Sequence, residues 1–244
     1  MPLRCALPAK RLRLRRRKPS PVLPLQGRRF ALTDSGNPVP DPLQHNDDRR
    51  RLRQQLRQRR RALNPHAQRQ ASLALMRRLI RLPVLRRARH VALYLPENGE
   101  IDPTPLISAL KARGVRVYLP VLRPLIENRL WFVRLQDDTQ LVLNRFRITE
   151  PALRQSAARS RRLAPWALDA VLMPLVGFDA CGHRLGMGGG FYDRTFAFAS
   201  HRHGPRPALI GVAHACQQVN ALPHQPWDVN LDMIVSDRQV WRPA

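Results

Sequence analysis

The chain has 244 residues, 43% of them hydrophobic, so it can form one large domain or two small ones with a sizeable core. Its 43 Lys and Arg against 17 Asp and Glu give a formal net charge of +26, which predicts an anionic ligand. No apolar run approaches the roughly 18 residues of a membrane span, and three cysteines without C-x-x-C spacing indicate neither a disulfide framework nor a zinc knuckle. We therefore expect a cytoplasmic protein with reduced thiols. We also expect a monomer, although composition and spacing do not determine the oligomeric state.

The positive charge is concentrated at the start of the chain. Residues 1–90 carry 25 basic and 4 acidic side chains, whereas residues 91–244 carry 18 and 13. Residues 1–45 combine eight prolines with arginine clusters and show no helical or strand period, so we predict a disordered basic extension before a folded domain over residues 46–244. Non-specific RNA contact is expected of such an extension.

A basic helix opens the folded part. Asn46 or Asp47 is suited to cap it. Leu52, Leu56 and Leu63 follow at spacings of four and seven, which places them on one face of the helix. The remaining positions are largely arginine. Without further context, the arginine-rich surface of this helix would be solvated or would contact RNA.

Helices and strands alternate after this first helix. Asn64 and Pro65 supply a cap and a first-turn proline for a second helix, which Pro83 ends. Strands are expected at 91–95, 115–119, 130–135, 141–143, 170–175, 208–213, 233–235 and 240–241, and helices at 105–113 and 191–199. The alternation predicts an α/β fold: an open, mostly parallel sheet with helices on both faces, preceded by a basic helical hairpin. This layout is similar to the three-layer fold of sugar-phosphate isomerases and CoA transferases.

A glycine cluster between a strand and a helix is the motif with the clearest chemistry. It comprises Gly186, Gly188, Gly189 and Gly190. Glycines let successive backbone N–H groups turn toward one point, and a helix N-terminus adds partial positive charge, so the loop suits phosphate. Arg184 and Arg194 flank it with full charges. A flexible hairpin or a close backbone crossing is the alternative that the loop alone leaves open.

Two common nucleotide motifs are absent from this loop. Phe191 stands where a G-x-G-x-x-G fingerprint needs its last glycine, and no G-K-[ST] follows as in a Walker A loop. Asp193 could stabilise the helix dipole or bind Mg²⁺, and spacing alone does not separate these roles. Spacing assigns no role to Asp228 either.

Several segments together resemble the 5-formyltetrahydrofolate cyclo-ligase family, whose members are also called methenyltetrahydrofolate synthetases. The strongest resemblance is Arg-Leu-Gly-Met-Gly-Gly-Gly-Phe-Tyr-Asp-Arg at 184–194, preceded by Pro-Leu-Val-Gly-Phe-Asp at 174–179. Further segments follow the order of the family, at 95–102, 117–120, 144–151 and 210–223. The resemblance spans roughly residues 49–242 and makes residues 46–244 the expected catalytic domain.

The resemblance implies a ring closure that depends on ATP and Mg²⁺. The formyl oxygen of 5-formyltetrahydrofolate is phosphorylated, N10 attacks the activated carbon, and phosphate leaves. The products are 5,10-methenyltetrahydrofolate, ADP and phosphate. Phosphoryl transfer depends on positioning and charge neutralisation, so no protein nucleophile is assigned.

The resemblance also implies roles for individual residues. The expected ATP-binding residues are Arg49, Arg50, Arg53, Arg184, Leu185, Gly186, Met187, Gly188, Gly189, Gly190, Phe191 and Tyr192. The expected folate-binding residues are Leu95, Glu100, Met187, Gly188, Gly189, Gly190 and Phe191, with Glu100 accepting hydrogen bonds from the pterin. Asp193 and Asp228 are the implied Mg²⁺ ligands. Arg49 stands where the family usually has lysine, which keeps the charge and permits bidentate phosphate binding.

Two other classes of protein remain as alternatives. A basic RNA-binding protein on an α/β scaffold would explain the charge, but only Phe30 precedes Tyr94 among the aromatic residues, which leaves no platform for base stacking. Sugar-phosphate isomerases and CoA transferases share the architecture, because a fold does not determine an activity. The glycine loop followed by Phe-Tyr-Asp favours an ATP-dependent enzyme.

Overall fold

The computed structural model describes residues 42–123, 128–153, 160–200, 206–223, 225 and 227–243. The described residues all belong to one compact unit, residues 40–244. Nearly all of the expected disordered extension, residues 1–45, lies outside the described residues, and so does its expected RNA contact. Among the helices that are described, none combines the length and apolar character needed to cross a membrane.

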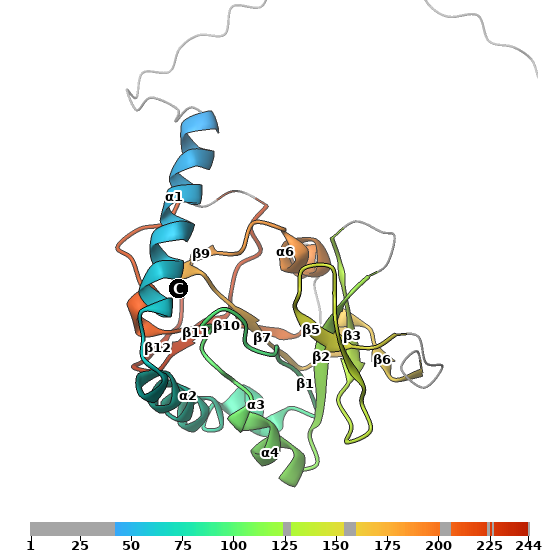
Figure 1. Cartoon of the computed structure of the whole chain (residues 1–244). Helices are drawn as coiled ribbons and strands as arrows, with labels where there is room; N and C mark the ends of the chain where they lie inside the picture. Colours follow the sequence, from blue (N-terminus) through green and yellow to red (C-terminus); the bar gives the residue numbers. More distant parts are fainter. Residues whose placement is uncertain are drawn as a thin grey trace, which may run out of the picture. The chain divides into compact units, whose positions relative to one another are not determined.

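A mixed sheet of eight strands forms the centre of the described residues (Figure 1). Its strands are β1 (His90–Ala92), β2 (Arg116–Leu122), β3 (Leu130–Arg134), β6 (Arg162–Leu163), β7 (Ala170–Pro174), β10 (Ala208–Ala213), β11 (Met233–Ser236) and β12 (Val240–Trp241). Their order is β12-β11-β10-β7-β1-β2-β3-β6. The run from β11 to β2 is parallel, whereas β12, β3 and β6 pair antiparallel with their neighbours.

Two small hairpins stand apart from this sheet. They are β4 (Leu141–Leu143) with β5 (Thr149–Pro151), and β8 (Gly177–Phe178) with β9 (Arg184–Leu185). The first follows β3 and the second follows β7, so each extends a connection between strands of the sheet. The second hairpin leads directly into the glycine loop.

The helices are α1 (Pro42–Arg61), α2 (Pro65–Leu79), α3 (Pro83–Arg87), α4 (Pro105–Ala112) and α6 (Phe191–Phe196), with 3-10 turns η1 (Pro165–Ala167), η2 (Ala197–Ser200) and η3 (Ala215–Gln217). The expected cap of α2 is confirmed, because Asn64 Oδ1 accepts from the Ala67 amide at 2.8 Å. Helix α1 begins before the expected cap at residues 46–47. Helix α2 ends at Leu79, before the expected stop at Pro83, and Pro83 instead opens the short α3, which was not predicted.

The sheet is covered on both faces, as predicted. Helices α2, α3 and α4 gather on one face (Figure 1), where Val91 of β1 and Leu172 of β7 are buried. Helix α6 and η2 cover the other face, where Ala92 and Met173 are buried. Adjacent residues of a strand point to opposite faces, so these continuous apolar runs are those of strands buried on both sides.

A third apolar cluster holds α1 against the β8–β9 hairpin. Leu56 of α1 is fully buried there with Val176, Leu185 and Leu222. The close approach needs Gly177, because a Cβ at that position would lie 2.4 Å from Leu56 Cδ1. This contact places the basic helix beside the strand that leads into the glycine loop.

The strand order reverses between β1 and β7. The chain moves outward from β1 to β2 on one side, whereas β7, β10 and β11 follow each other on the other side. The segments after β1 and β7 therefore leave the same edge of the sheet next to each other, which is the usual ligand position in open α/β sheets. Glu100 follows β1, and the glycine loop follows β7 by way of the β8–β9 hairpin.

We expect Gly177→Ala to lower the free energy of unfolding by about 1–3 kcal/mol, because the added methyl group displaces Leu56 in a packed cluster. Gly186→Ala is the matched control for stability, since a Cβ there would meet no atom within 4 Å. Urea denaturation of both variants measures the difference. Equal stability of the two variants would show that α1 is not packed on the hairpin as described.

Candidate functional site

The glycine loop, residues 186–190, connects β9 to α6. Gly188 and Gly190 have φ angles of +99° and +65°, values that strain any residue with a Cβ. Among the described residues, the backbone N–H groups of residues 187–190 make no hydrogen bond. The loop therefore keeps these donors available for a ligand, as a phosphate cradle requires.

Side chains bind the carbonyl oxygens of this loop instead. Arg53 Nε donates to Gly186 O at 2.9 Å. Gly189 O accepts from Asn128 Nδ2 at 3.0 Å and from Arg194 Nη1 at 2.7 Å. Because the carbonyls are held from α1, from the segment before β3 and from α6, the loop has a fixed conformation with its amides unused.

Two arginine–carboxylate pairs stand beside the loop. Arg49 Nη1 lies 3.1 Å from Asp228 Oδ2, and Arg49 is buried to 9% exposure. Arg184 of β9 forms an ion pair with Asp193 of α6. The Val229 amide donates to Asp193 Oδ1 at 3.2 Å, which joins the two pairs into one cluster.

Burial shapes the electrostatics of this cluster. It lowers the pKa of Arg53, and the neighbouring charge of Arg49 lowers it further. It also lowers the pKa of Arg184, against the opposing effect of Asp193. Arginine nevertheless stays cationic at neutral pH. The cluster of three arginines and two carboxylates therefore keeps a net positive charge, which favours an oligophosphate.

The carboxylates of Asp193 and Asp228 can supply only part of the coordination shell of a metal ion. The described residues contain no group of three or more His, Cys, Asp or Glu side chains arranged to hold a metal. Mg²⁺ commonly takes one or two carboxylates and completes its shell with water and substrate phosphates. Asp193 and Asp228 therefore suit Mg²⁺ that arrives with a bound phosphate chain.

Glu100 lies on the other side of the site, after β1. Its Oε2 accepts from the Glu97 amide at 3.2 Å, and its Oε1 lies 3.6 Å from Nη1 of Arg60, with 10% of the side chain exposed. Burial raises the pKa of Glu100, and the charge of Arg60 opposes this rise. Leu95, from the same segment, is half-buried against the core.

Tyr192 of α6 links the loop side of the site electrostatically to the Glu100 side. Burial raises the pKa of Tyr192, and the negative charge of Glu100 raises it further, so the two groups lie close enough for their charges to interact. Phe191 packs edge-on against Phe146 of the β4–β5 turn, with ring centroids 5.8 Å apart. Met187 is 45% exposed on the loop. An apolar wall thus lies next to the phosphate cradle.

Most of the expected site residues come together, but Arg50 does not. Its side chain is exposed and makes no hydrogen bond or ion pair with any described residue, so its role stays a prediction. Asn128 was not predicted from the sequence, because it shows no local signal. Arg60 was not predicted either, although it follows Leu56 by four residues and so continues the buried face of α1. Leu63, expected on that face, lies beyond the end of α1.

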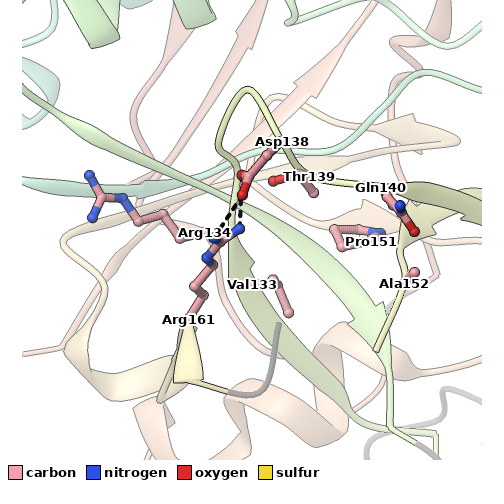
Figure 2. Close-up of a pocket in the computed structure, with 8 residues that line it drawn as sticks. All are labelled: Val133, Arg134, Asp138, Thr139, Gln140, Pro151, Ala152 and Arg161. Atoms are coloured by element: carbon pink, nitrogen blue, oxygen red, sulfur yellow. Dashed lines mark hydrogen bonds and ion pairs between the residues drawn. The ribbon is translucent and has the colours of Figure 1, made fainter. Parts of the chain in front are cut away.

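A small cavity lies away from this site, at the end of β3 (Figure 2). The side chains of Val133, Arg134 and Arg161 line it, and Arg161 forms two bonds of 2.9 Å with Asp138 across it. Its volume of about 10 Å³ is close to that of a single water site. It does not compete with the glycine loop as a ligand site.

The fold is that of an α/β protein with a mostly parallel sheet, and the candidate site lies at the switch point of this sheet, where ligands bind in many α/β enzymes. The sequence profile of the 5-formyltetrahydrofolate cyclo-ligase family matches residues 45–237. The 5-formyltetrahydrofolate cyclo-ligase of Escherichia coli K12 is 43% identical over 188 residues, which are 76% of this chain and 98% of that protein. The Haemophilus influenzae protein of the same name is 39% identical over 189 residues, 77% of this chain and 97% of that protein.

Solved structures agree with the sequence relatives. The Aquifex aeolicus 5,10-methenyltetrahydrofolate synthetase has a TM-score of 0.65 at 29% identity and covers 80% of this chain and 92% of its own. The Mycoplasma pneumoniae 5,10-methenyltetrahydrofolate synthetase has a TM-score of 0.60 at 26% identity, with coverage of 78% and 99%. This chain belongs to the 5-formyltetrahydrofolate cyclo-ligase family. The family and the α/β fold expected from the sequence are confirmed.

We expect Asp193→Ala to destabilise the protein as well as alter its site, because it leaves the buried Arg184 without its carboxylate. Since the Asp193 side chain is 27% exposed, the loss should be roughly 2 kcal/mol, less than fully buried pairs lose. Asp193→Asn keeps a hydrogen-bond acceptor and should lose less. Thermal denaturation without nucleotide compares the two, and a wild-type melting temperature for Asp193→Ala would contradict the pairing.

Proposed function

We propose that this chain converts 5-formyltetrahydrofolate to 5,10-methenyltetrahydrofolate at the expense of ATP, with Mg²⁺, and releases ADP and phosphate. The single observation that carries the proposal is the glycine loop, whose amides at 187–190 make no hydrogen bond within the described residues while arginines hold its carbonyls. Membership of the family supports the folate substrate. RNA binding as the main function is not favoured, since it leaves this loop without a purpose.

The phosphate chain of ATP would lie on the loop amides. Arg53 reaches the loop from α1 and lies close to Gly188, where a Cβ would be 3.6 Å from its Cζ. Both bonds of Arg49, to Asp228 and to Pro223 O, come from Nη1, so its second Nη can donate to a phosphate oxygen. Arg184 adds charge from β9. These groups position the terminal phosphate and neutralise it, which is the main requirement of phosphoryl transfer.

Mg²⁺, when bound with the nucleotide, would neutralise part of the phosphate charge. Asp193 and Asp228 would hold it, and their arginine partners keep both carboxylates oriented before it arrives. A site of this kind should bind Mg²⁺ weakly without nucleotide, because two carboxylates already paired with arginines attract a cation less strongly.

The folate would lie between the loop and Glu100. An ionised carboxylate can accept hydrogen bonds from the pterin amino group and a ring N–H together. Leu95 and the exposed Met187, with the Phe191 and Phe146 rings, would contact the apolar parts of the substrate.

The chemistry needs no covalent bond to the protein. The formyl oxygen attacks the terminal phosphorus, and the bond to ADP breaks. N10 then attacks the formyl carbon, the carbon–oxygen bond to phosphate breaks, and N10 loses its proton. The protein contributes by holding formyl oxygen and phosphorus in line and by excluding water, which would otherwise compete for the phosphate.

An absorbance assay for the methenyl product tests the function directly. The full chain with 5-formyltetrahydrofolate, ATP and Mg²⁺ should form product, whereas the same mixture without nucleotide should not. Product formed at equal rates in both mixtures, or in neither, would contradict the proposal.

Arg53→Met separates the nucleotide site from the folate site. We expect it to raise the KM for ATP by about tenfold or more, because it removes a charge and the bond to Gly186 O. The KM for the folate should change much less. Arg51→Met is the matched control, since Arg51 is exposed on the same helix. Equal effects of both variants on the KM for ATP would show that only the overall charge of α1 matters.

A further inference from the structure

Arg60, near the end of α1, is a charged side chain with no exposed surface. Its Nε donates to Asn98 O at 3.2 Å, and its Nη1 lies 3.6 Å from Glu100 Oε1. Within the described residues, neither Nη1 nor Nη2 makes a hydrogen bond. The guanidinium is therefore buried with fewer hydrogen bonds than it can form.

A buried guanidinium is costly unless an opposite charge compensates for it. For Arg60, burial lowers the pKa, and the charge of Glu100 is the largest effect that opposes this. The carboxylate is in turn only 10% exposed and has Arg60 behind it. Each charge therefore opposes the effect of burial on the other group, at the edge of the proposed folate site.

We propose that Arg60 is a positioning residue for folate binding, which keeps Glu100 ionised and directed toward the pterin. The inference rests on the proposed function, because it requires that Glu100 contact the folate. It explains why this arginine faces inward on a helix whose other buried positions include Leu56. A protonated Glu100 would lose one acceptor and its charge, so it would bind the pterin N–H donors less well.

Arg60 and Arg57 of α1 are the cations that act on Glu100. Together with the hydrogen bond from the Glu97 amide they favour the ionised carboxylate, whereas burial and the charge of Glu97 oppose ionisation. The pKa values of Tyr94 and Tyr192 are raised by burial, so both phenols are neutral at physiological pH. Burial lowers the pKa of His214, and the charge of Arg60 lowers it further, which keeps His214 neutral as well.

A purely structural role is the alternative to this inference. The bond from Arg60 Nε to Asn98 O alone would tie α1 to the segment after β1. A tie of that kind would affect the melting temperature of the protein. It would not change the pH at which folate binding is lost, so a pH profile separates the two roles.

Arg60→Gln removes the charge and provides the test. At acidic pH, binding weakens as Glu100 becomes protonated, so the acid limb of kcat/KM for the folate reports its pKa. We expect Arg60→Gln to raise the midpoint of this limb by about one unit and the KM for the folate by about tenfold. The KM for ATP should change by no more than about twofold.

Arg60→Lys keeps the positive charge but lacks the planar N–H donors of the guanidinium. It should therefore retain the wild-type midpoint of the acid limb of kcat/KM, even if its melting temperature falls. A midpoint raised by about one unit in Arg60→Lys would contradict the inference, and this result can be obtained even if Arg60→Gln does not fold. Arg59→Gln, at an exposed position next to Arg60, controls for loss of charge on α1. A wild-type midpoint in a folded Arg60→Gln would also contradict the inference.

Glu100→Gln distinguishes this inference from the function on which it rests. If Glu100→Gln leaves the KM for the folate unchanged, the assignment of Glu100 to the folate fails, and the inference fails with it. If Glu100→Gln raises that KM but Arg60→Gln changes neither the KM nor the midpoint, only the role of Arg60 fails.

Discussion

The proposed site depends on arginines that are buried beside a loop of glycines. Arg49 and Arg184 each hold a carboxylate, and Arg53 holds a carbonyl of the loop itself. Removing these groups from water is costly, and the ion pairs offset only part of that cost. The net positive charge that remains would be neutralised by a phosphate chain. The same pairs keep the two proposed metal-binding carboxylates in place before nucleotide binds.

Helix α1 connects the two halves of the proposed site. Arg53 contacts the glycine loop, and Arg60 lies behind Glu100. Seven residues separate these arginines, which corresponds to roughly 10 Å along a helix. Because Leu56 between them is locked against Gly177, the helix cannot shift along its axis without opening a cavity. The spacing between the glycine loop and Glu100, the proposed phosphate and folate sites, is therefore set by one rigid element.

Patterns of local origin were predictable from the sequence. The cap at Asn64, the apolar runs of β7 and β10 and the glycine cluster each depend on neighbouring residues, and each lies where expected. The bounds of α1 and the short α3 were not predicted, because helix ends depend on packing that the local pattern does not contain. The strand order was also beyond local patterns, although it brings the segments after β1 and β7 together.

The candidate site shows the same division between local and tertiary information. The resemblance placed Asp193, Asp228 and Glu100 in one site, but their arginine partners follow from tertiary contacts. The many arginines of α1 look alike in the sequence, and only the fold shows that Arg60 faces inward whereas Arg50 is exposed. The position of Arg60, four residues after the buried Leu56, was the available signal in the sequence that its side chain faces inward. A charged residue on a buried face contradicts the usual pattern, and such positions are often functional.

Binding of the ATP phosphates by the amides of the glycine loop can be tested by nuclear magnetic resonance of the full chain with ¹⁵N-labelled glycine, because Gly188, Gly189 and Gly190 report on the loop directly. We predict that their amide signals shift on addition of Mg·ATP and stay in place with Mg²⁺ alone. Binding of Mg·ATP, detected by calorimetry, that leaves these amide signals unmoved would contradict it.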